Sequence, residues 1–237
     1  MADGAFFDSA FGLAAPAAGC FCFSFTGAAL RFGASTTLGN YLLPRVVGGY
    51  ARDHARVSLE TVVGTSADVL SWVKGERAQF GFVEAPLQDA DIETEGIGQD
   101  ELILTAAATH RLARVGTLLA RSLAQVPILR REATSGTQQL VDVQLTRSGA
   151  NSPTQMVLGS TEALKQAVIQ GVGVAWLPRL AVMHELAKGE LARVPVEGLA
   201  ICRTLSLIRV RGAHLSAAAA ALVEDVRLAL SISNTDG

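Results

Sequence analysis

The feature of this sequence that most constrains its fold is a repeated alternation of short apolar runs with amphipathic helical segments. Apolar side chains recur at helical spacing between residues 38 and 54, whereas residues 57–63 are rich in β-branched residues. Strands that alternate with helices predict a parallel sheet with right-handed crossover connections. In the first part of the chain we expect strands at residues 30–33, 57–63 and 79–83, and helices at residues 38–54 and 67–74.

The same alternation starts again in the second half of the chain. The strand at 101–107 is expected to leave the first unit, and a late strand at 204–210 to return to it. Two lobes joined by two crossing strands would follow, with a closing helix at 217–230 packed on the first lobe. Between the crossing strands we expect strands at 127–129, 156–158 and 172–177, and helices at 118–124, 138–147, 161–170 and 180–187.

Composition excludes several classes of function. The chain has 237 residues and a net charge of −2, without the basic stripe of a free-standing nucleic-acid binder. The G-x-S-x-G, Walker A and H-E-x-x-H motifs are absent, and the four histidines lie far apart. Ser71 and Lys74 match S-x-x-K, but they lie within an expected helix and lack the partner motifs. We therefore expect no catalytic activity, no cofactor and no metal.

The amino-terminal residues and the cysteines bear on location. Residues 9–30 carry no charge, which is about the length of a membrane span, but glycines and a proline dilute their hydrophobicity. The acidic start lacks the basic region of a signal peptide. Three cysteines, Cys20, Cys22 and Cys202, do not form a disulfide framework. We expect an irregular leader at residues 1–28, a cytoplasmic protein and no contact with a membrane.

Small hydroxyl residues follow the expected strands at four helix starts. Ligands of parallel sheets bind beyond the carboxyl ends of the strands, where helix N-termini offer free N–H groups and a positive dipole end. Each hydroxyl alone indicates only helix capping, and the pairs Thr65–Asp68 and Ser135–Gln138 have capping-box spacing. Their recurrence predicts one site for a carboxylate, phosphate or sulfate, formed by Ser35, Thr36, Thr65, Ser66, Ser135, Gly136, Thr137, Ser160 and Thr161.

Other residues near the expected site have weaker signals. Trp176 and Pro178 end a strand and would form either an apolar wall of the site or part of the core. Glu84, at the end of the third strand, is expected to pair with a nearby basic residue. Arg130 and Arg131 are expected to be solvated on a loop. The G-x-G at Gly171 lacks a third glycine and precedes a strand, which argues against a dinucleotide site.

Several motifs together resemble a known family. The run RFGASTTLGNYLLP at residues 31–44 is similar to the opening of the effector-binding domain of LysR-type transcriptional regulators. No single motif is decisive, but the order and spacing of the whole set are specific. The resemblance covers residues 29–230 and continues through VGT at 63–65, FVEAP at 82–86, DELIL at 100–104, HRLA at 110–113, SGT at 135–137, GSTEALK at 159–165 and GVGVAWLP at 171–178.

The resemblance implies an α/β fold of two Rossmann-like subdomains joined by two crossover strands, like the type II periplasmic binding proteins. Subdomain I would comprise residues 29–104 and 205–232, and subdomain II residues 105–204. A small effector would bind in the cleft between them, an anion by the inference from the helix starts, and the domains would pair side by side in a homodimer or larger homo-oligomer. The implied effector contacts are Ser35, Thr36, Thr65, Ser135, Thr137, Ser160 and Thr161, with Trp176 nearby.

The sequence departs from the family at its front. Family members carry an N-terminal helix-turn-helix domain and a charged linker helix, and residues 1–28 contain neither. We therefore expect DNA binding only through a domain absent from this chain. A periplasmic solute-binding protein of a transporter is the alternative, although the leader does not predict export. An enzyme on the same fold is a third reading, and it lacks a catalytic set.

Overall fold

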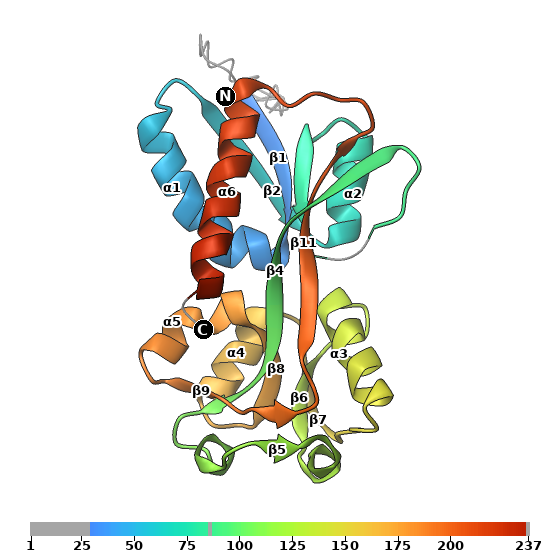
Figure 1. The fold of residues 1–237 in the computed structure, drawn as a ribbon, viewed down its shortest axis with the longest axis vertical. Helices are drawn as coiled ribbons and strands as arrows, with labels where there is room; N and C mark the ends of the chain where they lie inside the picture. The colour runs from blue at the N-terminus through green and yellow to red at the C-terminus, as the bar shows by residue number, and fades with distance from the viewer. Residues whose placement is uncertain (1–28, 85–86, 236–237) are drawn as a thin grey trace, which may run out of the picture.

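The computed structural model describes residues 29–84 and 87–235, which form two lobes joined by two long strands (Figure 1). The predicted α/β fold with two crossing strands is confirmed. Lobe I contains β1 (Ala29–Ser35), η1 (Leu38–Leu42), α1 (Leu43–Asp53), β2 (Ser58–Gly64), α2 (Ser66–Lys74), β3 (Phe80–Val83) and α6 (Ala217–Thr235). Lobe II contains η2 (Arg111–Arg114), β5 (Leu118–Leu119), η3 (Ala120–Gln125), β6 (Ile128–Arg131), α3 (Gly136–Arg147), β7 (Thr154–Leu158), α4 (Thr161–Ile169), β8 (Val174–Pro178), α5 (Arg179–Ala187), β9 (Leu191–Arg193) and β10 (Val196–Glu197).

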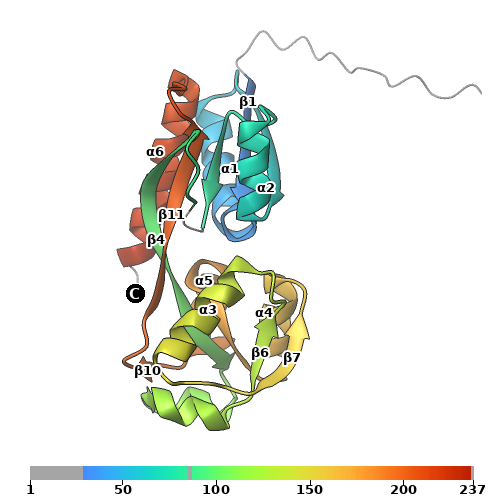
Figure 2. The ribbon, with the colours of Figure 1, turned by 90° about the vertical axis from the view of Figure 1, so that its right-hand side faces the viewer.

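The connecting strands are β4 (Ile92–Ala107) and β11 (Ile201–Val210), which run antiparallel beside each other through both lobes (Figure 2). They join the two halves into one sheet of order β2-β1-β3-β11-β4-β8-β6-β7. Within each half the neighbours β1–β2, β1–β3, β6–β7 and β6–β8 are parallel, as predicted. A continuous hydrogen-bonded sheet therefore connects the lobes.

Lobe I has an aromatic core. Phe32 stacks on Phe80 with ring centroids 5.4 Å apart, and Phe82 meets both rings edge-on. Helices α1 and α6 cover this face of the sheet (Figure 1), and the Tyr50 hydroxyl on α1 donates a hydrogen bond of 2.8 Å to the Ala218 carbonyl on α6. The closing helix thus packs on lobe I. The exact residue boundaries of the two subdomains stay a prediction.

Several local predictions were wrong for physical reasons. Strand β4 begins at Ile92, well before the predicted start at residue 101, because its first half has one solvent-facing side and carries glutamates that hide the strand pattern. Residues 118–124 form β5 and the 3₁₀ helix η3 in place of the expected helix. The expected helix at 38–54 opens with the π-helical turn η1. Pro44 follows that turn and has no N–H to continue a regular ladder.

No helix in the described part of the chain is both long and apolar enough to span a membrane. The expected leader at residues 1–28 and the two cysteines within it lie outside the described residues.

We predict that Gly81→Ala destabilises lobe I. A Cβ at this position on β3 would lie 2.3 Å from Val69 Cγ1 of α2, and neither element has room to move in a packed core. The expected loss is about 1–3 kcal/mol of unfolding free energy, measured by urea denaturation. Gly48→Ala is the control, because nothing lies within 4 Å of a Cβ on this exposed face of α1. It should stabilise by up to about 1 kcal/mol. Equal stability of the two variants would contradict the described packing.

Candidate ligand-binding site at the lobe junction

A buried arginine lies where the two lobes meet. Arg203 on β11 faces Asp100 on β4, directly opposite in the antiparallel register, and its Nε and Nη2 donate to Asp100 Oδ2 at 3.1 and 2.7 Å. Its Nη1 is paired with Glu84, which follows β3. The side chains of Arg203, Glu84 and Asp100 are only 4%, 8% and 1% exposed. One guanidinium therefore faces two carboxylates away from water.

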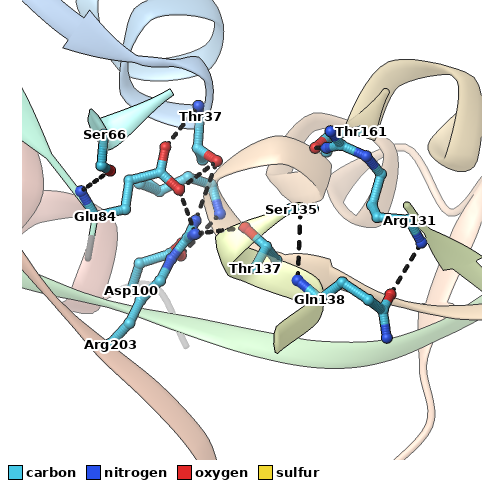
Figure 3. A network of polar contacts seen from close by, with 11 residues as sticks. Thr37, Ser66, Glu84, Asp100, Arg131, Ser135, Thr137, Gln138, Thr161 and Arg203 are labelled. Atoms are coloured by element: carbon cyan, nitrogen blue, oxygen red, sulfur yellow. Dashed lines mark hydrogen bonds and ion pairs between the residues drawn. The ribbon is translucent and has the colours of Figure 1, made fainter. Parts of the chain in front are cut away.

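The same guanidinium contacts a hydroxyl from each lobe (Figure 3). Arg203 Nη2 donates to Thr37 Oγ1 of lobe I at 3.1 Å, and Nη1 donates to Thr137 Oγ1 of lobe II at 2.9 Å. Thr37 is the N-cap of η1, and Thr137 lies in the first turn of α3. The side chain of Arg203 thus connects the starts of two helices that belong to different lobes.

Burial and neighbouring charges shift the pKa values of Arg203 and Asp100 in opposite directions. Burial alone would lower the pKa of Arg203, but the neighbouring Glu84 and Asp100 outweigh it and raise the pKa of the guanidinium, which stays charged. Burial raises the pKa of the Asp100 carboxyl, and the attraction of Arg203 offsets only part of that shift. The cluster is held together by the ion pairs and is costly to open.

Glu84 is bound as an anion would be bound at a helix N-terminus. Its Oε1 accepts a 2.7 Å hydrogen bond from the Thr37 backbone N–H, and its Oε2 accepts one of 2.9 Å from the Thr37 hydroxyl. Its own N–H donates to Ser66 Oγ at 3.4 Å, which brings the start of α2 to the same place. The predicted pairing of Glu84 with a basic residue is confirmed.

In lobe I the predicted hydroxyls have different surroundings. Ser35, at the end of β1, is 2% exposed, and its Oγ has no hydrogen-bond partner among the described residues. Thr36 is exposed. Thr65 forms the predicted capping box with Asp68: its hydroxyl accepts from the Asp68 N–H at 3.1 Å, and Asp68 accepts from the Thr65 N–H. Ser35 is the predicted contact whose hydroxyl is left unsatisfied.

In lobe II the hydroxyls cap helices, and one of them pairs with an arginine. Ser135 and Ser160 accept hydrogen bonds from the third residue of α3 and of α4, and Gly136 is exposed between Ser135 and Thr137. Thr161 Oγ1 accepts a 2.7 Å bond from Arg131 Nη1. The side chain of Gln138 binds the Arg131 N–H, so Ser135 and Gln138 make half of the predicted capping box.

A second polar contact joins the lobes beside the first. Tyr41 in η1 donates a 2.9 Å hydrogen bond to Glu162 Oε2 on α4. Lys165 pairs with Glu162 at 3.1 Å and with Glu185 at 2.8 Å, and its ammonium lies 5.0 Å from the centre of the Tyr41 ring. A third contact runs from Arg179 at the start of α5 to the Ser233 carbonyl near the end of α6.

Trp176 and Pro178, at the end of β8, were expected to form either an apolar wall of the site or part of the core. Trp176 packs in the hydrophobic core of lobe II and lines a surface hollow of about 510 Å³ with residues 193–196 and 198–200, and Pro178 is buried at the start of α5. Whether either residue also contacts a ligand stays a prediction.

Arg130 and Arg131 are paired with Asp142 and Glu132, with side chains 16% and 13% exposed, so the expectation that they are solvated was wrong.

Arg203, which organises the junction, was not predicted from the sequence. Arg203 lies in β11 on the same face as Ile201 and Leu205, a spacing of two that marks the inward side of a strand. The predicted strand began after this arginine, so the signal was missed. Across residues 29–84 and 87–235, no group of His, Cys, Asp and Glu side chains has the geometry of a metal site.

Comparison with known proteins decides the family. The model of the LysR substrate-binding domain matches residues 26–231. This chain belongs to the LysR substrate-binding domain family. YeiE of Escherichia coli K12, an uncharacterized HTH-type transcriptional regulator, is 39% identical over 188 residues, which are 79% of this chain and 64% of YeiE. The chain therefore spans less than two thirds of the length of that regulator.

Two other comparisons add context. The phosphonates import ATP-binding protein PhnC of Anaeromyxobacter dehalogenans is 37% identical over 204 residues, 85% of this chain and 41% of PhnC. The regulatory domain of CcmR from Synechocystis PCC6803, solved in complex with 2-PG, superposes with a TM-score of 0.75 at 22% identity, covering 87% of this chain and 97% of that domain. The effector-binding domain of QuiR with shikimate gives 0.70 at 17% identity, covering 89% and 99%. Both structures have the fold of this LysR domain.

We predict that Arg203→Met destabilises the protein by about 3–5 kcal/mol at pH 7, because two buried carboxylates lose their cation. Burial already raises the pKa of Asp100, so protonation relieves part of the cost, and the deficit should shrink as the pH falls towards 5. Urea denaturation at both pH values measures the effect.

Arg193→Met is the control for this experiment. Arg193 pairs with Glu101 at the surface, with side chains 51% and 25% exposed, and its loss should cost less than about 1 kcal/mol. If Arg203→Met costs no more than Arg193→Met, the ion-pair cluster does not stabilise the lobe junction.

Proposed function

We propose that this chain is the ligand-sensing part of a LysR-type transcriptional regulator and that it binds a small anion at the lobe junction. The observation that carries the proposal is the convergence of hydroxyl-bearing helix starts from both lobes on Arg203, with Thr37 from one lobe and Thr137 from the other. A ligand held between these helix starts would contact both lobes at once.

The chemistry of the junction favours an anion. Helix N-termini present free N–H groups and a positive dipole end, and hydroxyls add further donors. The buried Ser35 hydroxyl, which has no partner within the described chain, is a ready donor for a ligand oxygen. The complexes of CcmR with 2-PG and of QuiR with shikimate support a small molecule as the ligand class. The proposed contacts are Ser35, Thr36, Thr65, Ser66, Ser135, Gly136, Thr137, Ser160 and Thr161, with Trp176 and Pro178 nearby.

Ligand binding would act through the relative position of the lobes. A ligand that binds one arrangement of the lobes more tightly shifts the population towards it by its difference in affinity. In the full regulator, that shift would alter how paired domains present DNA-binding heads that lie outside this chain. The proposal implies a cytoplasmic homodimer or larger homo-oligomer, without catalysis.

The match to PhnC keeps a second function open. That protein is named for phosphonates import, and a solute-sensing or solute-binding role in transport would use the same junction. Phosphonates are anions, so both functions predict the same ligand chemistry. They differ in the partner: a regulator requires a DNA-binding domain, whereas a transport role requires association with an importer. Co-purification of the full-length protein with operator DNA or with importer subunits separates the two.

We predict that small oxyanions stabilise the protein and that Ser160→Ala weakens this effect. A ligand at 100 times its Kd should add about 2.7 kcal/mol to the unfolding free energy, which thermal unfolding with sulfate, phosphate, alkylphosphonates and carboxylates would detect. Ser160→Ala removes the hydroxyl at the start of α4, so the same ligand should bind with about a fivefold to tenfold higher Kd, a cost of about 1–1.5 kcal/mol.

Ser216→Ala separates ligand binding from helix capping. Ser216 Oγ accepts from the Ala219 N–H at 3.1 Å at the start of α6, which lies at the end of lobe I away from the junction (Figure 1). Both variants should lose about 1 kcal/mol of stability from the lost cap. Only Ser160→Ala should lose ligand affinity. Equal affinity in the two variants, or no stabilisation of the parent protein by any oxyanion, would contradict the proposed function.

A further inference from the structure

A carboxylate of the protein itself occupies the anion position at the start of η1. Glu84 accepts from the Thr37 N–H at 2.7 Å and from the Thr37 hydroxyl at 2.9 Å, and it is paired with the Arg203 guanidinium. A helix N–H, a hydroxyl and a guanidinium on one pair of oxygens form a complete oxyanion site. In this structure the complete site is filled.

The charge around this position leaves little room for a second anion. Asp100 lies against the same guanidinium, with its Oδ2 2.7 Å from Arg203 Nη2. Two carboxylates therefore already neutralise and exceed the charge of Arg203. A third anion placed beside them would be repelled at low dielectric, so an anionic group gains the guanidinium only if one carboxylate leaves.

Glu84 and Asp100 differ in how they are held. Asp100 lies on the continuous strand β4, directly opposite Arg203 in the ladder, and it also accepts from the Leu180 N–H. Glu84 lies just beyond the end of β3, and its carboxylate bonds extend to Thr37 and Arg203. Glu84 is therefore the carboxylate outside the paired strands, and its departure would free the donors of Thr37 as well as one side of Arg203.

We propose that Glu84 is a built-in competitor for the effector: its carboxylate fills the oxyanion site formed by Thr37 and Arg203, and an anionic ligand binds by replacing it. The inference rests on the proposed function, because it concerns the same lobe junction. It adds the requirement that the ligand carry a group with at least two oxygens, such as a carboxylate, sulfonate or phosphonate. The exchange leaves Thr137 on Arg203, so the ligand becomes linked to lobe II through the same guanidinium.

Competition from Glu84 lowers the apparent affinity of the site. When the ligand-competent state is only a fraction of the population, the apparent Kd rises by the inverse of that fraction. Glu84→Gln keeps the size of the side chain but removes the charge, and it offers one acceptor oxygen to Thr37 and Arg203 where the carboxylate offers two. The variant should bind sulfate and methylphosphonate with a Kd about tenfold lower than the parent, measured by isothermal titration calorimetry on the full chain.

Glu101→Gln is the matched control. Glu101 is adjacent to Asp100 on β4 and pairs with Arg193 at the surface, so its substitution removes one negative charge nearby without touching the Arg203 cluster. Its Kd for both anions should stay within about twofold of the parent, because exposed charges are screened. An equal gain in Glu101→Gln and Glu84→Gln would assign the effect to net charge and overturn the competitor role.

Further results of the same titrations also test the competitor role of Glu84. If the parent binds an anion and Glu84→Gln binds it no more tightly, the competitor role is wrong while the anion sensor stands. If neither protein binds either anion at millimolar concentration, both proposals fail. Should Glu84→Gln not fold, as judged by circular dichroism, Glu84→Asp replaces it. The shorter side chain keeps the charge but retreats from Thr37, and it too should lower the Kd. An unchanged Kd would overturn the competitor role.

Discussion

The arrangement of the lobes depends on one buried guanidinium. Arg203 sits in the strand that returns to lobe I, pairs with Asp100 on the strand that leaves it, and reaches Glu84 and Thr37 on one side and Thr137 on the other. Removing this charge from water is costly, and the cost is offset only while its partners stay in place. The cluster therefore requires the ends of β3, η1 and α3 to remain close together, and this requirement defines the lobe junction.

The sheet gives this cluster its rigidity. Strands β4 and β11 pair along their length, so the two lobes share one ladder and the cross-strand pair Arg203–Asp100 keeps a fixed position. The other members come from the end of β3 and from the starts of η1 and α3. Tyr41 and Glu162, which meet across the junction, also lie outside the two paired strands. A charge fixed on the shared ladder, with partners from both lobes, is a suitable arrangement for a sensor, since exchange of one partner would leave the ladder unchanged.

Among the predicted hydroxyls, contacts between residues close in the sequence could be predicted, whereas contacts made by folding could not. Capping is a local property, and the Thr65–Asp68 box was predicted from spacing and is present. The Ser135–Gln138 box is only half made, because the Gln138 side chain accepts from the Arg131 N–H at the end of the preceding strand β6. Arg130 and Arg131 were expected in solvent because two of their partners, Asp142 on α3 and Thr161 on α4, come close only when the chain folds. The role of these residues in ligand binding stays a prediction.

The sequence by itself determined the alternation of strands and helices, the two-lobed α/β fold and the placement of hydroxyls at helix starts. These properties follow from hydrophobic periodicity and from capping, which act over a few residues. Only the tertiary structure decided that Arg203, Asp100, Glu84, Thr37 and Thr137 form one cluster, because they lie on five separate elements or their ends. It also decided that the Glu84 carboxylate accepts from the Thr37 N–H and hydroxyl at the start of η1. Burial selects the partners of a charge, and burial is known only once the chain has folded.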